Sequence, residues 1–300
     1  MRQLATACLL AAALGAACLP AQAGAARFCD RAGDLTAGRQ DRMLRVADVI
    51  RQLLEPSGRR VALISRSGLD LQRFGIRYSH AGLGLQANPR GAWAVRQLYY
   101  ACDESRPRLY DQGLAGFLLG NDDPNVGFIS IVTLPEAEGG PVERTALSPP
   151  QALDILAATY SANAYAFSTR YQNCNQWVME LLASAWGGLP AGPQVRHDAQ
   201  HWLRTQGYEP TAVPLGSHAI AFAAHFVPLI HVQDHPPDDL HALTMHISMP
   251  TSIEAFVRKH VPQAERIELC HTEHRIVVRR GWTPIGATCE AGVGDEVVGL

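Results

Sequence analysis

The chain has 300 residues, of which 47% are hydrophobic, and its formal net charge at pH 7 is −2. This size allows a substantial buried core, in one large domain or in a domain with an extension. No basic run interleaved with aromatic residues is present to follow a phosphate backbone, so we expect no nucleic-acid partner. Lys259 is the only lysine, which excludes a Walker A phosphate loop and disfavours a lysine Schiff base.

The amino terminus predicts a cleaved signal peptide at residues 1–23. Arg2 supplies a positive charge, an apolar stretch follows at residues 4–19, and Ala21-Gln22-Ala23 is a small-residue cleavage signature. The mature protein would then be periplasmic or secreted. Attachment of a lipid to Cys18 is the lesser alternative, because the residues before it lack the usual larger aliphatic side chain.

After this leader, no apolar run reaches the roughly 18 residues that a membrane-spanning helix needs. We therefore expect a protein that does not span the membrane. The strongest candidate segment, residues 219–232, is interrupted by His225 and Pro228. We expect this segment to be buried in the fold.

Removal of the leader leaves an odd number of cysteines in an oxidising compartment. The preferred pairs are Cys29 with Cys102 and Cys270 with Cys289, which leaves Cys174 as a free thiol. The sequence alone does not fix this connectivity. The alternative for Cys174 is an inert buried cysteine.

The hydrophobic pattern predicts mixed helices and strands in the first half of the mature chain. Residues 36–54 carry a helical apolar stripe, and strands at 76–86 and 93–101 form a hairpin. The other expected elements are a strand at 61–64, a short helix at 111–119, a buried strand at 126–134 and a helix at 149–158 with Ser148 as its N-cap.

The second half begins with an amphipathic helix over Cys174–Trp186, closed by glycines. Further helices are expected at 195–206 and 251–260, with Glu254 placed for a capping box in the second, and two short strands within 266–280. Gly and Pro after residue 190 mark a candidate boundary. We expect the residues beyond it to be an extension packed on the core.

Two polar segments carry the candidate chemistry. Cys174 stands where a loop becomes a helix, in Asn173-Cys174-Asn175-Gln176-Trp177, and His80 lies on a strand, in Tyr78-Ser79-His80-Ala81-Gly82. The thiolate is the reactive form of cysteine, and a helix N-terminus or a nearby imidazolium lowers the pKa of a thiol. Because a Cys/His pair is the minimal apparatus for acyl transfer, the sequence predicts Cys174 as nucleophile and His80 as its base.

The order of these signals, a histidine on a strand before a helix that begins with cysteine, resembles the circularly permuted branch of the NlpC/P60 papain-like superfamily. Three segments look more closely like the DUF2145 family of exported bacterial proteins: residues 77–82, the run from 99 to 114, and residues 171–177. The resemblance implies an α+β fold. In it, a permuted papain-like core at residues 24–190, with an antiparallel sheet packed on helices, is followed by a C-terminal α/β extension at residues 191–300.

The resemblance also implies an exported thiol-dependent amide or ester hydrolase, or an acyltransferase, acting on cell-envelope peptides or lipids. Such sites carry a third polar residue on the strand after the histidine, which orients the imidazole ring. Antiparallel pairing of the hairpin puts Tyr99 opposite His80 and Gln97 one step diagonal on the same face. We select Gln97 for this role, with Tyr99 as the competing candidate because a strand register can slip.

The oxyanion of an acyl-transfer intermediate needs hydrogen-bond donors. We expect the backbone N–H of Cys174 to be one of them, with the side chain of Tyr171 or Gln172 as a second. No cofactor and no metal ligand are expected for this site.

Two other readings stay open. His197 and His201 have the i, i+4 spacing of zinc proteases, but Asp198 stands where their general-base glutamate would be. The remaining histidines after Cys174 are too loosely spaced to define a ligand set. Alternatively, a papain-like scaffold binds an envelope peptide or protein and keeps Cys174 for packing alone.

Overall fold

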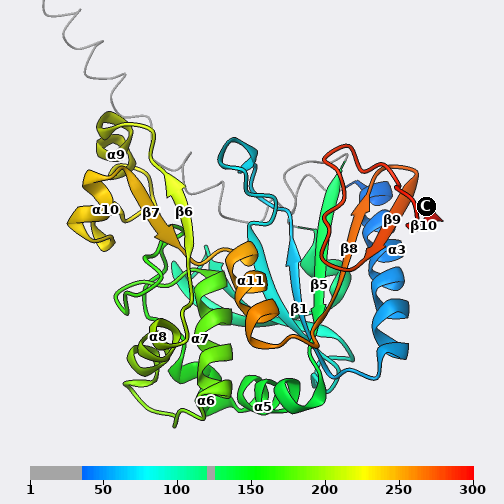
Figure 1. Cartoon of the computed structure of the whole chain (residues 1–300), viewed down its shortest axis with the longest axis horizontal. Helices are drawn as coiled ribbons and strands as arrows, with labels where there is room; N and C mark the ends of the chain where they lie inside the picture. Colours follow the sequence, from blue (N-terminus) through cyan, green and yellow to red (C-terminus); the bar gives the residue numbers. More distant parts are fainter. Residues whose placement is uncertain (1–35, 120–125) are drawn as a thin grey trace, which may run out of the picture.

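The computed structural model describes residues 36–119 and 126–300, so the predicted signal peptide at 1–23 and Cys29 lie outside the described residues. Its centre is an eight-stranded sheet with the order β10-β9-β8-β5-β1-β2-β3-β4, in which every pairing is antiparallel (Figure 1). The strands are β1 Val61–Arg66, β2 His80–Leu85, β3 Ala94–Ala101, β4 Arg106–Gln112, β5 Gly127–Thr133, β8 Glu265–His271, β9 Arg275–Arg280 and β10 Glu296–Gly299. A separate two-stranded sheet pairs β6 (Thr211–Pro214) with β7 (Thr244–Ile247).

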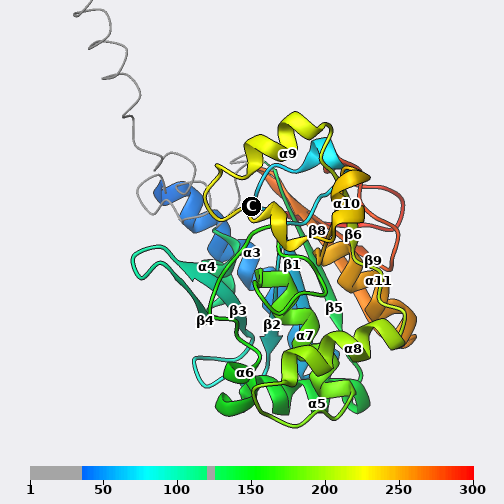
Figure 2. The same ribbon diagram turned by 90° about the vertical axis from the view of Figure 1, so that its left-hand side faces the viewer.

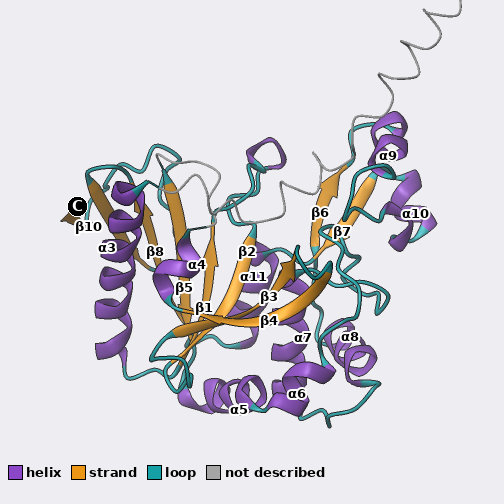
Figure 3. Ribbon diagram, turned by 180° about the vertical axis from the view of Figure 1, so that it is seen from behind, coloured by secondary structure: helices purple, strands orange, loops and turns teal. Residues whose placement is uncertain are grey.

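Helices cover both faces of the large sheet (Figure 3). The α-helices are α3 Ala37–Leu54, α4 Leu114–Leu118, α5 Glu136–Leu147, α6 Pro149–Asp154, α7 Cys174–Trp186, α8 Val195–Thr205, α9 His218–Ala224, α10 Pro237–His241 and α11 Pro250–His260. Short 3-10 helices occur at Glu55–Ser57, Gln72–Phe74 and Val232–Asp234. The mixed α+β architecture with an antiparallel sheet is as predicted. Within the described residues no helix has the length and apolarity to cross a membrane.

The alternation of side chains along β1 explains the two layers of helices. Leu63 faces a core built with α5, α6, α7, α8 and α11, whereas Ile64 faces a second core built with α3 and α4. Successive residues of a strand point to opposite faces of its sheet, so a strand buried on both faces is apolar throughout. The largest buried side chain of α7, Trp177, is fully buried in the first core.

The region predicted as a C-terminal extension supplies three strands to the same sheet. β8 pairs with β5 along its whole length, with Ser130 opposite Glu268, and β9 and β10 continue the sheet beyond it. The disulfide predicted between Cys270 and Cys289 is present and ties β8 to the following loop. Cys102 is also disulfide-bonded.

Several predicted elements have different bounds. The first hairpin strand begins at His80 and not at residue 76, the helix after Ser148 ends at Asp154, and the helix expected at 111–119 covers only Leu114–Leu118. Strand β4 occupies the preceding residues, where no strand was predicted, and α5 was missed altogether.

Two expectations about side chains were wrong. Residues 219–232 are not buried as a segment, because Phe222 and Phe226 are 67% and 72% exposed. Glu254 forms no capping box: Ser252 Oγ accepts the Met249 N–H at 3.2 Å, while Glu254 is buried and accepts from Arg266 Nε at 3.1 Å. The apolar composition of residues 219–232 did not lead to burial, and the spacing of Glu254 did not lead to a helix cap.

Candidate functional site

The candidate site is built on the first turn of α7, where Cys174 is the first helical residue. Asn173 is its N-cap, and the Asn173 Oδ1 atom accepts the Gln176 N–H at 2.7 Å. An N-cap of this type satisfies one of the backbone N–H groups that a helix start leaves without a partner. Cys174 is a free cysteine, as predicted, and its residue is 7% exposed. The thiol thus lies at the positive end of the helix dipole.

The start of α7 is docked on the start of β2. Asn175 Nδ2 donates to the Ser79 carbonyl oxygen at 3.1 Å, and the backbone of Ala81 lies within hydrogen-bonding reach of the Cys174 sulfur. Figure 2 shows α7 and α8 in front of the sheet, with β1 and β2 behind α7. Cys174 therefore lies beside the backbone of the predicted base, His80, whose ring contacts Phe117 of α4 in the core on the other face of the sheet.

The His80 ring is held by a chain of two amides. Its Nε2 atom contacts Gln97 Oε1, and Gln97 Nε2 donates to Gln112 Oε1. An amide oxygen carries no proton, so the ring must donate from Nε2 and keep its lone pair on Nδ1. Among the described residues no hydrogen bond to Nδ1 is formed, and none joins the imidazole to the thiol. The register Leu83 opposite Arg96 extends to Tyr99 opposite His80, which leaves Gln97 diagonal as predicted.

Gly82 permits the close approach of β3 that this contact needs. A Cβ atom built on Gly82 would lie 2.5 Å from Val95 Cγ1 and 3.3 Å from Gln97 Cβ. Gly82→Ala is therefore expected to push β3 away and to lower the free energy of unfolding by about 1–3 kcal/mol, the usual cost of overpacking. Urea unfolding measures this loss.

The matched control is Gly38→Ala, because nothing lies within 4 Å of a Cβ at Gly38 in α3. Alanine is the better helix former, so this variant is expected to be unchanged or more stable by up to about 1 kcal/mol. Equal stability of Gly82→Ala and the wild type would show that β3 does not depend on Gly82 for its position.

The electrostatics of the resting site favour neutral groups. Burial raises the pKa of Cys174 to about 11, against the lowering effect of Arg66 and of nearby backbone N–H groups. Burial and the Arg66 charge lower the pKa of His80 to about 3, although the Gln97 contact acts in the opposite direction. The expected lowering of the thiol's pKa is therefore not found. Desolvation of the charged forms outweighs the helix dipole at this position.

Residues that the sequence analysis did not select complete the site. Arg66 ends β1 and pairs with His80 in the β1–β2 register, Gln112 holds Gln97, and Asn175 holds Ser79. The strand was expected to end at Ile64, so Arg66 was not considered. Gln112 lies in one of the segments that resemble the DUF2145 family, and this resemblance was the only feature of the sequence that pointed to Gln112.

A pocket of about 360 Å³ opens beside Gln112, at the edge formed by β3 and β4. Its other lining residues are Tyr99, Tyr100, Ala101, Cys102, Asp103 and Tyr110. The Tyr160 ring lies tilted against Tyr100, with ring centroids 5.3 Å apart, and burial, with the charges of Cys174 and Tyr99, raises the pKa of its phenol. Tyr160 thus extends the group of tyrosines at this edge of the sheet.

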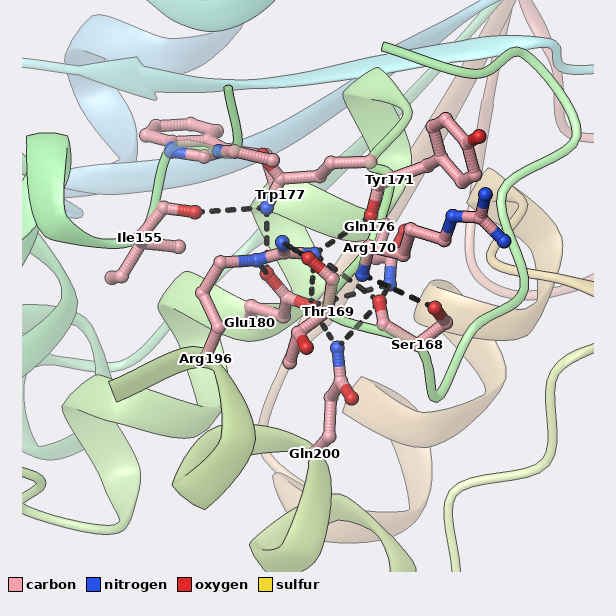
Figure 4. A network of polar contacts seen from close by, with 12 residues as sticks. Ile155, Ser168, Thr169, Arg170, Tyr171, Gln176, Trp177, Glu180, Arg196 and Gln200 are labelled. Carbon is pink, nitrogen blue, oxygen red and sulfur yellow. Dashed lines mark hydrogen bonds and ion pairs between the residues drawn. The ribbon is translucent and has the colours of Figure 1, made fainter. Parts of the chain in front are cut away.

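The loop before Cys174 is held in place by the buried ion pair between Glu180 and Arg196 (Figure 4). The Glu180 carboxylate of α7 accepts from Arg196 Nε at 2.8 Å, from Gln200 Nε2 at 2.7 Å and from Gln172 Nε2 at 2.6 Å. Arg196 also donates to the carbonyl oxygens of Thr169 and Tyr171, at 2.6 and 2.9 Å. α8 therefore fixes the backbone that leads into the nucleophile.

The hydrogen bonds of this network occupy the Gln172 side chain, so Gln172 is not available as the second oxyanion donor. The Gln172 side chain donates to Glu180 and to the Ile155 carbonyl, accepts from Ala157 N–H, and is fully buried. It is a structural residue of the loop. The Tyr171 ring stacks on His231 with centroids 4.2 Å apart, and the backbone N–H groups of Cys174, Asn175 and Ala81 face the sulfur instead.

The histidines considered for zinc do not converge. His197 and His201 are exposed on α8, and His197 Nδ1 contacts Asp198 at 3.1 Å. Across residues 36–119 and 126–300, no three His, Cys, Asp or Glu side chains gather into a group that could hold a metal ion.

Comparison with known proteins identifies a family for the chain. No curated protein and no solved structure matches the chain. A family model described as an uncharacterised protein conserved in bacteria, DUF2145, matches residues 53–257, which contain His80, Gln97 and Cys174. Because the match covers more than half of its length, the chain belongs to the DUF2145 family.

Proposed function

We propose that this protein is an exported thiol-dependent amide or ester hydrolase, or an acyltransferase, built on a permuted NlpC/P60-like, papain-like core. The observation that carries the proposal is a free thiol at a helix N-terminus, docked on the strand that begins with His80, a histidine whose Nε2 is engaged by Gln97. In this arrangement the basic lone pair of His80 lies on Nδ1, and this nitrogen would act as the base for Cys174. Gln97 would orient the ring and not take part in proton transfer.

Because the Cys174 thiol and the His80 imidazole are both neutral before substrate binds, the reaction would begin with a proton transfer between them. Cys174 Sγ would attack the acyl carbon while its proton passes to His80 Nδ1, so that charge forms only when substrate has displaced water. The tetrahedral intermediate would expel the leaving group, which takes the proton from Nδ1. Water or another acceptor would then attack the thioester, give its proton to Nδ1 and release the Cys174 thiol.

The donors at the start of α7 support this scheme. Backbone N–H groups of Cys174 and Asn175 point toward the sulfur, and a carbonyl oxygen bound to that sulfur would develop its negative charge close to them. Oxyanion donors of this kind contribute about 2.7–4 kcal/mol each in characterised hydrolases.

The pocket beside Gln112 supports a substrate that lies along the β3–β4 edge. Its tyrosines present aromatic faces and hydroxyl groups, which suit an extended amphipathic segment such as a cell-envelope peptide or the acyl chain of a lipid. An exported enzyme would meet both.

Trapping of the acyl-enzyme tests the proposal. Incubation of the mature protein with p-nitrophenyl esters of short and long carboxylic acids is expected to place one acyl group on Cys174. Mass spectrometry of proteolytic fragments locates this group. Cys174→Ala should carry none, and His197→Ala, which changes an exposed histidine on α8, should acylate at the wild-type rate.

The competing function is an envelope-binding protein on the same scaffold. The burial of Cys174 and the raised pKa of its thiol favour this reading. It predicts that no ester acylates Cys174 and that His80→Ala alters only local stability. Absence of a Cys174 adduct with every acyl length would therefore reject the enzyme and leave the scaffold.

A further inference from the structure

The segment that joins β6 to β7 exposes large apolar side chains. Ile220, Phe222 and Phe226 are 56%, 67% and 72% exposed, and Val227 is 40% exposed. The Phe222 and Phe226 rings meet edge to face with centroids 5.4 Å apart, so they form one apolar ridge. Single exposed apolar residues are ordinary on a protein surface, whereas a contiguous group of this kind marks a surface that meets a partner.

The apolar tip, defined as residues 217–230, lies at one end of the molecule. It contains α9, of which no residue is buried. Figures 1 and 2 both show α9 at the opposite end from α5 and α6. Apolar side chains that project from an end of a molecule fit a soft, fluid surface, whereas a protein partner needs a groove of matching shape.

The charge of the tip suits an apolar phase. No Asp, Glu, Lys or Arg occurs between Glu209 and Asp234, although 18% of the chain is charged. The ionisable side chains of this stretch are those of His218, His225 and His231. Because a fixed charge is costly in hydrocarbon, the tip can leave water without that cost.

Two arginines border the tip where it meets the body of the protein. The Arg170 guanidinium lies over the Tyr171 ring, 5.1 Å from its centroid, and this ring stacks on His231 directly after the tip. Arg73 lies over the Phe74 ring at 4.5 Å, and Phe74 packs in one apolar cluster with β6. Both arginines are exposed, and neither forms an ion pair within residues 36–119 and 126–300.

Most carboxylates on the same segments are engaged by the protein. Side-chain oxygens of Asp70, Asp234 and Asp239 accept hydrogen bonds from neighbouring groups. Asp238 of α10 is exposed, and its side chain has no such contact within the described residues. The border of the tip thus presents more free positive than free negative charge, which complements the phosphates of lipid headgroups.

The tip is attached to the loop that leads to Cys174. The Ala162 N–H donates to the Leu229 carbonyl oxygen at 2.8 Å, and the His231 N–H donates to Asn163 Oδ1 at 2.8 Å. A surface that received the tip would therefore lie close to this loop.

We propose that the apolar tip binds the surface of a phospholipid bilayer, with Phe222 and Phe226 among the acyl chains and Arg73 and Arg170 at the level of the phosphates. The contact is interfacial and not a span. The inference deepens the proposed function and rests on it for one point, that Cys174 would meet acyl groups which the membrane presents. Of the envelope substrates named above, the tip favours a lipid over a soluble peptide.

Sedimentation with phospholipid vesicles tests the binding. The protein is used without residues 1–23, because the apolar run of the predicted signal peptide would itself bind lipid. One set of vesicles contains phosphatidylcholine, and a second contains phosphatidylcholine mixed with phosphatidylglycerol. The bound fraction against lipid concentration gives a partition coefficient, and analytical ultracentrifugation without lipid gives the oligomeric state.

The wild type is expected to bind both kinds of vesicle. Phe222→Ser combined with Phe226→Ser should lower the partition coefficient at least about tenfold, because the gain from burying two aromatic rings is lost. The matched control is Leu44→Ser with Leu153→Ser, which removes exposed leucines from α3 and α6. This control should bind as the wild type does.

A second double variant tests the charged border. Arg73→Gln with Arg170→Gln is expected to weaken binding to the vesicles with phosphatidylglycerol by about tenfold and to change binding to phosphatidylcholine alone much less. High salt should weaken binding of the wild type in the same selective way.

Three results would overturn the proposal. The first is a wild type that binds neither kind of vesicle, and the second is a phenylalanine double variant that binds as well as the wild type. The third is a wild-type dimer without lipid that the phenylalanine double variant splits, because the tip would then be an interface between two copies of the chain.

Vesicle binding and acyl-enzyme formation are separate measurements on the wild type. A protein that binds vesicles through the tip but forms no acyl-enzyme would retain the membrane contact and lose the proposed catalysis. A protein that acylates Cys174 but binds no vesicle would do the reverse.

Discussion

His80→Ala is expected to slow the acylation of Cys174 by p-nitrophenyl esters by about 10²–10⁴-fold, the usual contribution of a positioned general base. The effect should be this large because burial raises the pKa of Cys174 to about 11, so that almost no thiolate exists at pH 7 without a proton acceptor. The acylation rate is measured by mass spectrometry at timed intervals. Circular dichroism and urea unfolding show whether the variant remains folded.

The pH dependence gives a second measure of the same step. With neutral thiol and neutral imidazole as the reactive pair, the rate should be nearly constant between the pKa of His80, about 3, and that of Cys174, about 11. Iodoacetamide alkylation, which needs the thiolate, should rise throughout this interval. A rate of acylation that falls below pH 6.5 would contradict a buried, neutral His80.

Glu180→Ala is expected to lower the free energy of unfolding by about 3–5 kcal/mol, because it leaves the Arg196 charge buried and without its carboxylate. The Glu180 and Arg196 side chains are 0% and 8% exposed, so water cannot replace the lost partner at low cost. Urea unfolding followed by tryptophan fluorescence measures the change.

A double variant tests the origin of this loss. Glu180→Gln with Arg196→Met removes both charges and should be less destabilised than Glu180→Ala, since no buried charge is left unpaired. Asp41→Ala removes one partner of an exposed pair with Arg45 and should change stability by less than about 1 kcal/mol. If Glu180→Ala resembles Asp41→Ala, the carboxylate does not hold the loop.

The parts of the fold that the sequence predicted well are those with a strong periodic pattern. α7 was predicted with its bounds, because an N-cap asparagine precedes it, a glycine pair follows it, and its apolar residues recur throughout the segment. The hairpin register was predicted from its turn, and this register placed Gln97 diagonal to His80. Local signals sufficed in both cases.

The missed elements are those that tertiary contacts stabilise against local preference. α5 contains Gly139, Gly140 and Pro141, which disfavour a helix, yet Gly139 packs against Leu134 and Val61, and Val142 and Ala146 of the same helix are buried in the first core. β4 carries arginines and Pro107, a composition typical of an edge strand and not of a core strand.

Of the candidate site, the sequence predicted the free Cys174 and the contact between His80 and Gln97, but not the electrostatics. Cys174, His80 and Gln97 follow from motif and register, whereas the pKa of the thiol depends on how deeply the site is buried, which no local pattern reports. Arg66 and Gln112 act across strands, and only the three-dimensional pairing identifies them.

The position of β8 has a consequence for the newly made chain. β5 is bordered by β1 and β8, and Arg266 of β8 follows Ser130 of β5 by 136 residues. Until that late segment emerges, β5 has one open edge in an otherwise apolar sheet, and such edges recruit other chains. Pairing over so long a separation is also slow. A chain cut short before β8 would therefore be a substrate for chaperones and proteases, and not a smaller working protein.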